Sequence, residues 1–228
     1  MSVQDNGHEH EFEAAYGLPE ALPKGETILW QGAPDFADMA VRVFHLKKAV
    51  VYFIVLMAVR GSYLYSLGEP FTTVLAGVLM VAVLGLTAIV ALALLAWLTA
   101  RTTAYTLTDK RVVMRIGIVL TLTFNLPFKR IETAGLQLTA KGFGDMPLVL
   151  SGGDRIGWLN LWPHVRPWQV AQPQPMLRCV PHAQAVAATF EKAWSAERGR
   201  SAGVSAPALR QERNTGWAAN KTTLSEPV

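Results

Sequence analysis

The sequence predicts an α+β membrane protein in which a hairpin of two transmembrane helices carries a small β-rich domain capped by a C-terminal helix. Two observations predict the membrane part: a long uncharged apolar segment, and a second apolar segment directly ahead of it. A third, the series of short β-branched segments and glycine-containing turns that follows, predicts the domain. Of the 228 residues, 51% are hydrophobic and 17% are charged, whereas about 25% are charged in an average soluble domain. The excess apolarity lies between Ala49 and Leu98.

The longer apolar segment runs from Phe71 to Leu98 and contains no charged residue. About 20 apolar residues suffice to cross a bilayer, so we expect this segment to span the membrane. The segment Ala49–Leu67 is also apolar but contains Arg60, whose aliphatic stem can carry the guanidinium to the nearer interface. Only Gly68-Glu69-Pro70 separates the two segments, which predicts an antiparallel helical hairpin.

Basic residues flank the predicted hairpin on the outside and are missing from its connecting loop. They are Arg42, Lys47 and Lys48 ahead of the first span and Arg101, Lys110 and Arg111 after the second. The positive-inside rule therefore places both termini in the cytoplasm and makes the chain a multi-pass protein. The first 20 residues contain no lysine or arginine, so we do not expect a secretory signal. The single cysteine, Cys179, excludes an intramolecular disulfide.

The β-rich part follows the second span. Strands are expected at Thr102–Thr108, Arg111–Ile116, Ile118–Leu126, Ile131–Thr139, Pro147–Ser151 and Ile156–Leu161. In His182–Ala196, apolar residues at four-residue intervals predict an amphipathic helix. We therefore expect a pleckstrin-homology-like (PH-like) β-sandwich or barrel closed by this helix. The expected division is a cytoplasmic N-terminal arm and pre-membrane segment (1–48), the hairpin (49–98, with spans at 49–67 and 71–98), the cytoplasmic PH-like domain (101–196) and a disordered tail (197–228).

Motifs for catalysis, nucleotides or metals are missing from the sequence. It has no glycine-rich phosphate loop, no paired cysteines for zinc and no nucleophile elbow. The histidines His45, His164 and His182 do not form a spaced ligand set. The net charge of +4 gives no support for binding nucleic acid. We expect a protein that is not an enzyme and has no catalytic residues, cofactor or metal.

The segment Trp158–Trp168 (WLNLWPHVRPW) is the first candidate for a partner-binding surface. Tryptophan and arginine dominate interface hot spots, and the prolines restrict the backbone, which lowers the ordering cost of binding. The candidate contact residues are Trp162, His164, Arg166 and Trp168. Alternatively, the tryptophans lie in the core or at the membrane interface.

Small residues on one face of the second span form the second candidate surface. Ala82, Gly85, Ala88 and Ala91 recur every three residues, and small residues let transmembrane helices approach closely. This face either packs on the first span or docks a partner's helix, which includes the helix of a second copy in a homodimer. Gly85 and Ala88 are its central candidates.

Membrane lipid is a further expected partner. Lys47, Lys48, Arg101, Lys110, Arg111 and Arg115 would then form a face for anionic lipid. Most of these residues are also explained by the topology.

Several segments resemble known families. The segments LPEALPKGETILWQGAPD (Leu18–Asp35) and YTLTDKRVVMRIG (Tyr105–Gly117) are similar to bacterial PH-domain membrane proteins. The stretches LWPHVRPW (Leu161–Trp168) and PMLRCVP (Pro175–Pro181) resemble the PuhB family of photosynthetic-complex assembly proteins of purple bacteria, which are encoded near the reaction-centre H subunit. The resemblance covers roughly residues 18–196.

The resemblance implies a non-catalytic factor in the bacterial inner (intracytoplasmic) membrane. Such a factor would help the reaction centre assemble within its light-harvesting complex through transient contacts with reaction-centre subunits. One alternative is a general PH-like module that binds lipid or another membrane protein. Another is delivery of bacteriochlorophyll, with His45 or His164 as axial ligand. The neighbouring genes separate the first two, and pigment absorbance tests the third.

Overall fold

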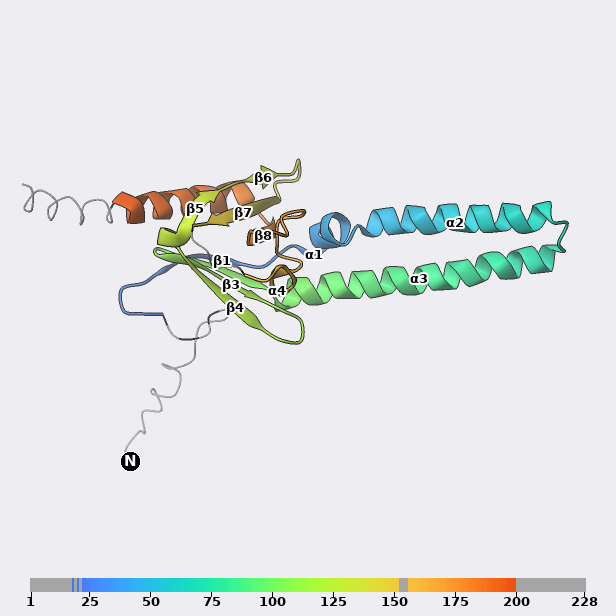
Figure 1. Cartoon of the computed structure of the whole chain (residues 1–228), viewed down its shortest axis with the longest axis horizontal. Coiled ribbons are helices and arrows are strands. Elements are labelled where there is room, and N and C mark those ends of the chain that lie inside the picture. The colour runs from blue at the N-terminus through green and yellow to red at the C-terminus, as the bar shows by residue number, and fades with distance from the viewer. Residues whose placement is uncertain (1–17, 19, 21, 152–155, 200–228) are drawn as a thin grey trace, which may run out of the picture.

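A helical hairpin projects from one end of a β-rich domain in the computed structural model of the chain (Figure 1). The structure describes residues 18, 20, 22–151 and 156–199. The N-terminal arm up to residue 17, the turn at residues 152–154 and the tail from residue 200 lie outside the described residues. With two helices in the hairpin and mostly strands in the domain, the chain has the expected α+β fold class.

The hairpin consists of α2 (Leu46–Ser66) and α3 (Phe71–Thr102), which lie side by side and antiparallel (Figure 1). At 1.5 Å per residue, the 32 residues of α3 extend about 48 Å, more than the roughly 30 Å of a bilayer's hydrocarbon core. Both helices are long and apolar enough to cross a membrane, and only 6% of each apolar window is buried inside the protein. Each helix differs by a few residues from its expected bounds.

A short helical segment leads into the hairpin. It consists of α1 (Phe36–Asp38) and the π-helical turn η1 (Met39–Val43). The side chain of Asp35 caps α1, because its Oδ1 accepts a hydrogen bond of 2.8 Å from the backbone N–H of Asp38. This segment turns the chain from the domain into the start of α2.

The first sheet has the order β1-β2-β3-β4 and is antiparallel throughout. Its strands are β1 (Ile28–Gly32), β2 (Ala104–Thr108), β3 (Arg111–Ile116) and β4 (Leu122–Pro127). The strand β1 precedes the membrane hairpin, yet it pairs with β2, which follows the hairpin. The domain therefore does not begin at residue 101 as expected, since the pre-membrane segment supplies its edge strand.

The second sheet is built around β7 (Gly144–Leu150), which pairs antiparallel with β5, β6 and β8. These are β5 (Ile131–Ala134), β6 (Gln137–Leu138) and β8 (Met176–Val180), and the 3₁₀ turn η2 (Phe128–Arg130) precedes β5. The segment expected as a strand at Ile156–Leu161 is instead the short helix α4 (Trp158–Leu161). The strand β8 was not expected.

A C-terminal helix over residues 183–199 closes the domain core, and Figure 1 shows it alongside the second sheet. Val186 and Phe190 on this helix are buried with residues of both sheets, among them Met114 and Leu148. The rings of Phe128 and Phe190 meet edge to face, with centroids 5.5 Å apart. The expected amphipathic helix is thus present, and it continues past residue 197, where the tail was expected to begin.

Candidate functional site

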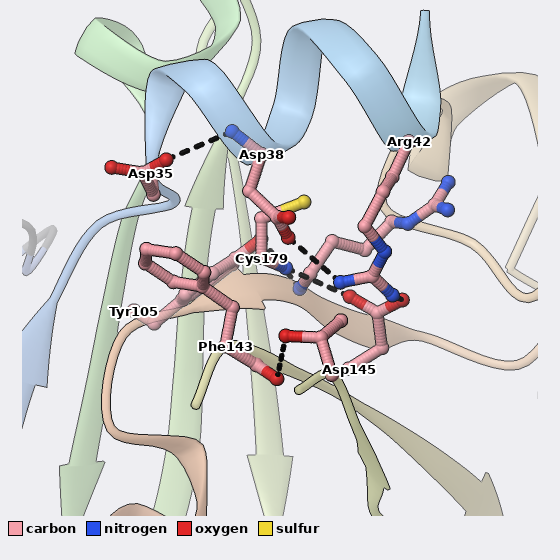
Figure 2. Close-up of polar contacts among 9 residues, drawn as sticks. Asp35, Asp38, Arg42, Tyr105, Phe143, Asp145 and Cys179 are labelled. Atoms are coloured by element: carbon pink, nitrogen blue, oxygen red, sulfur yellow. Dashed lines mark hydrogen bonds and ion pairs between the residues drawn. The ribbon is translucent and has the colours of Figure 1, made fainter. Parts of the chain in front are cut away.

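Ion pairs join the pre-membrane helical segment to the domain, as Figure 2 shows. Arg42 on η1 donates from Nη1 to Oδ2 of Asp38 over 2.7 Å. From Nη2 it donates to Oδ2 of Asp145, the second residue of β7. Burial lowers the pKa of the Arg42 guanidinium, but the charge of Asp145 and the hydrogen bond with Asp38 outweigh it and raise the pKa overall. Arg42 therefore remains a permanent cation between two carboxylates.

Cys179 extends this connection to β8. Its backbone N–H donates to Oδ1 of Asp145 over 2.8 Å, and its carbonyl accepts from the N–H of Asp35 over 2.9 Å. The side chain is buried, and burial, together with the nearby Asp145 and Asp38, raises the pKa of the thiol above its ordinary value. A thiol that stays protonated is a poor nucleophile, so Cys179 has a structural role at this junction.

An apolar cluster fixes the end of α3 at the same junction. Met39, Ala40 and Phe44 pack with Ala96 and Cys179, all of them buried. Apolar contacts thus hold the last turns of α3 against η1 and β8, and the Arg42–Asp145 ion pair holds η1 against β7. The hairpin leaves the domain in a defined direction for this reason.

His164 lies fully buried behind α4, with a hydrogen bond at each ring nitrogen. The hydroxyl of Tyr105 is 2.6 Å from Nδ1, and Oγ1 of Thr103 is 3.1 Å from Nε2. The Tyr105 hydroxyl oxygen also accepts the backbone N–H of Arg178 over 3.2 Å. Burial and then the charge of Arg178 lower the pKa of His164 to about 3. The imidazole is neutral at physiological pH.

This burial corrects the expectation for His164. The side chain is 0% exposed and both nitrogens have partners, so in this structure it neither contacts a partner nor offers a nitrogen to a pigment. His45, the other histidine considered for a pigment, is exposed at the N-cap of α2 with φ 54°.

The other three candidate contact residues of the tryptophan-rich segment, Trp162, Arg166 and Trp168, lie at or near the surface. Trp168 is 95% exposed, whereas Trp162 is 48% exposed and meets the ring of Phe44 edge to face at 5.8 Å. Arg166 is half-buried and donates from Nη1 to Oε1 of Gln174 over 3.1 Å.

The loop that carries Trp168 is braced at its base. Val165 forms a β-bridge with Pro175, and the N–H of Arg166 donates to the carbonyl of Gln174 over 3.0 Å. The structure therefore presents Trp168 on a pinned loop, with Trp162 against the base of the membrane hairpin.

The small-residue face of α3 packs on α2. A Cβ on Gly85 would lie 2.8 Å from Cγ of Phe53, and one on Gly77 would lie 2.5 Å from Cδ1 of Leu64. Ala88 is half-buried on the same helix. Of the two interpretations of this face, the structure shows packing on the first span. Gly85 is consequently covered and does not present a surface to another helix, which corrects its place among the candidate contacts.

The expected face for anionic lipid is divided between the two ends of the domain. Because β2 starts directly after α3 and runs away from it, the β2–β3 turn with Lys110 lies at the far end. Arg111 beside that turn is paired with Glu26 through bonds of 2.7 and 3.0 Å. Only the residues at the hairpin end remain together, namely Lys47, Lys48, Arg101 and Arg115.

Sequence reasoning missed the contact between Arg42 and Asp145. From the sequence, Arg42 was interpreted only as a topology signal and Asp145 had no assigned functional role, because no local pattern links two residues 103 positions apart. Within the described part of the chain, no group of three or more His, Cys, Asp or Glu residues is placed to hold a metal ion.

Comparisons with known proteins agree with this architecture. Residues 48–194 match the family described as "Bacterial PH domain". The chain is 37% identical over 206 residues to the "Uncharacterized 23.7 kDa protein in puhA 5'region" of Rhodobacter capsulatus, covering 88% of this chain and 94% of the relative.

Among solved structures, a DUF1696 family protein with a pleckstrin-homology domain from Shewanella loihica is 14% identical. The match covers 40% of this chain and 69% of that chain, with a TM-score of 0.27. The family match covers both long helices and most of the domain. The chain belongs to the bacterial PH domain family.

Proposed function

We propose that the chain is a non-catalytic assembly factor for the photosynthetic reaction centre and its light-harvesting complex, acting through transient contacts with reaction-centre subunits. The relative from Rhodobacter capsulatus is named for its place in the 5' region of puhA, and the family that the chain resembles is encoded near the reaction-centre H subunit. Two stretches carry the family resemblance, LWPHVRPW and PMLRCVP. The first begins at the last residue of α4 and continues into the braced loop, and the second contains β8. The β-bridge between Val165 and Pro175 brings the two stretches together.

The hairpin anchors this factor in the intracytoplasmic membrane. Large apolar side chains cover the outside of both helices, for example Ile54, Val59, Leu86 and Val90, and all of these are more than half exposed. Such a surface is costly in water and favourable in lipid. The basic residues at the domain end support a cytoplasmic position for the domain and both termini. Reporter fusions after Val228 and ahead of Ala49 should both read cytoplasmic, and a periplasmic signal from either one contradicts this topology.

The exposure of Trp168 is the observation that best supports a contact surface in the braced loop. A tryptophan 95% exposed on a pinned loop has no role in the core of this chain, and tryptophans are enriched among interface hot spots. We assign the contact with the cytoplasmic part of a reaction-centre subunit to Trp168, with Trp162 and Arg166 beside it. The pinned base lowers the ordering cost of binding.

Gene deletion with complementation tests this function. Deletion should lower the amount of reaction centre in the membrane while pigment synthesis continues, and the wild-type gene should restore it. A Trp168→Ala variant should accumulate normally and restore assembly poorly, because truncating a hot spot costs about 2 kcal/mol or more. Normal reaction-centre abundance in the deletion strain contradicts the proposed function.

A matched control separates contact from stability. Tyr65→Ala truncates an aromatic side chain that is 79% exposed at the opposite end of the hairpin, so it should restore assembly fully. If Trp168→Ala also restores assembly fully, the contact surface lies elsewhere on the protein. Western blots of the membrane fraction verify that each variant is present in equal amounts.

A further inference from the structure

We propose that the turn between β3 and β4, residues Gly117–Thr121, inserts its apolar side chains into the headgroup–acyl boundary of the bilayer that holds α2 and α3. This inference rests on the membrane anchorage in the proposed function, but not on any contact with the reaction centre. It gives the domain a second attachment to the membrane besides the hairpin.

The turn exposes three consecutive aliphatic side chains. Val119 is 90% exposed and Leu120 is 79% exposed, and Ile118 precedes them at 37%. The sequence predicted a strand from Ile118, but β4 begins only at Leu122, so these residues do not enter the sheet. Turns that face water are usually built from Gly, Asn, Asp, Ser or Pro. An Ile-Val-Leu turn is suited to an apolar medium.

The register of the sheet places this turn beside the end of the membrane hairpin. Ala104, two residues after α3 ends, is opposite Arg115 on β3. From Arg115 the chain continues past the end of α3 toward the membrane, and two or three residues at about 3.3 Å each extend about 7–10 Å. Because Ala104 lies about 7 Å beyond the end of α3, this distance brings the turn level with the last turn of α3, which contains Arg101. Figure 1 shows the green turn next to β4 at the end of the domain from which α3 leaves.

Trp97 and Arg101 mark the depth of the membrane interface at this level. Arg101 lies over the ring of Trp97 with 5.7 Å to the centroid, and tryptophans and basic residues are typical of the interfacial belt. The apolar turn therefore reaches the depth at which aliphatic side chains leave water.

The charge around the turn agrees with a membrane surface. Between Asp109 and Glu132 the sequence contains no acidic residue, whereas Arg115 lies two residues ahead of Gly117. Anionic headgroups attract a basic residue near the surface. A lipid surface therefore matches both the apolar turn between β3 and β4 and the basic Arg115 beside it.

The backbone of the turn has a fixed shape. Gly117 has φ +119°, and a Cβ at this position would collide with the carbonyl oxygen of Leu120. Only glycine fits such a conformation. The turn is therefore folded tightly, and it holds Val119 and Leu120 outward at little further ordering cost.

Site-directed labelling measures the depth of the turn. Val119→Cys and Leu120→Cys, each carrying an environment-sensitive fluorophore (NBD), are reconstituted as full-length protein in vesicles of phosphatidylglycerol and phosphatidylethanolamine without reaction centre. Both labels should be quenched by spin-labelled lipid, and aqueous iodide should quench them several-fold less than a label on Asn125. Asn125 is the matched control because it is exposed on β4, about 10 Å along the strand from its start at Leu122 and therefore further from the membrane than the turn.

A label at Leu86→Cys, on the exposed outside of α3, separates the two proposals. If Leu86 is quenched by spin-labelled lipid while residues 119 and 120 respond to iodide as Asn125 does, the anchorage stands and the insertion of the turn is overturned. The turn would then be left for a protein partner. If Leu86 is also quenched only by iodide, the anchorage in the proposed function fails, and the insertion fails with it.

Discussion

Arg42 and Asp145 form an ion pair that joins the segment ahead of α2 to the central strand of the second sheet, across 103 positions of the sequence. The Asp145 side chain is almost fully buried, whereas that of Arg42 keeps 27% of its surface exposed. The pair also recruits Asp38 and the backbone of Cys179. The helical hairpin and the domain are thereby coupled through charges that have few alternative partners.

Loss of Arg42 should destabilise the domain. In Arg42→Met the carboxylate of Asp145 remains buried without its cation, a change that typically costs about 3–5 kcal/mol. We expect the free energy of unfolding to fall by about 3 kcal/mol. Tryptophan fluorescence during denaturant unfolding in detergent micelles measures it.

Lys129→Met is the control for this change. Lys129 is paired with Glu197 at 4.0 Å, but its side chain is 71% exposed, and exposed pairs contribute little. Its free energy of unfolding should stay within about 0.5 kcal/mol of the wild type. Equal losses in the two variants would contradict a special role for the buried pair.

Protonation of His164 should make the domain less stable in mild acid. Its pKa is about 3 in the folded state and 6.5 in its ordinary state, so the unfolded chain binds more protons between these values. Stability is therefore complete above about pH 6.5 and falls as the pH is lowered toward 3, with a slope that approaches 1.4 kcal/mol per pH unit, as an order of magnitude. Unfolding measured between pH 7 and pH 5 tests this where most carboxylates remain ionised.

His164→Gln provides the comparison for the pH series. Glutamine still offers a donor and an acceptor near Thr103 and Tyr105 but has no proton to gain in this range. The variant should be less stable at pH 7 and should lose the decline between pH 6.5 and pH 5. A decline as steep as in the wild type would assign it to other groups.

Cys179 should resist thiol reagents in the folded protein. The side chain is fully buried and its thiol pKa is raised by burial and by Asp145, so little thiolate is present or reachable. A maleimide should leave the native protein unmodified in detergent and modify it fully after unfolding, as measured by intact mass. Rapid modification of the native protein would place the thiol at the surface. The same measurement gives the amount of label that Cys179 itself takes up, which must be subtracted in the variants with an added cysteine.

The sequence predicted the parts of the fold that depend on local pattern. Hydropathy located both long apolar helices within a few residues, and a turn at Asp109-Lys110 separates β2 from β3 between the two expected strands. It could not predict β1, because a five-residue strand that pairs across the whole hairpin has no local signal. The short apolar segment at Ile156–Leu161 was assigned to the wrong type of element, since periodicity alone does not distinguish so short a strand from a helix.

The candidate surface was predicted less completely than the fold. The proline-rich context marked the segment around Trp162 and Trp168, but only the structure distinguishes an exposed Trp168 from a buried His164. The burial of His164 follows from hydrogen bonds to Tyr105 and Thr103, about sixty positions away in sequence. The spacing of small residues on α3 was consistent with either interpretation, and the position of Phe53 decides between them.

Enlarging Gly85 should loosen the membrane hairpin. The ring of Phe53 occupies the space that a side chain at position 85 would need, with Cγ 2.8 Å from the site of a Cβ. Gly85→Val forces α2 and α3 apart or displaces the ring, and such overpacking typically costs about 1–3 kcal/mol. The variant should unfold at a lower fraction of denaturing detergent, as followed by helical circular dichroism.

A second substitution tests whether the Phe53 ring is the cause of that loss. In Gly85→Val combined with Phe53→Ala, the space released by the ring accepts the new side chain, so part of the stability lost in Gly85→Val should return. Leu86→Val is the matched control, because residue 86 is the next position on α3 but faces outward, and it should change stability little. If the stability losses of the two single variants simply add in the double variant, Gly85 and Phe53 are not in contact and the small-residue face of α3 is open to another helix.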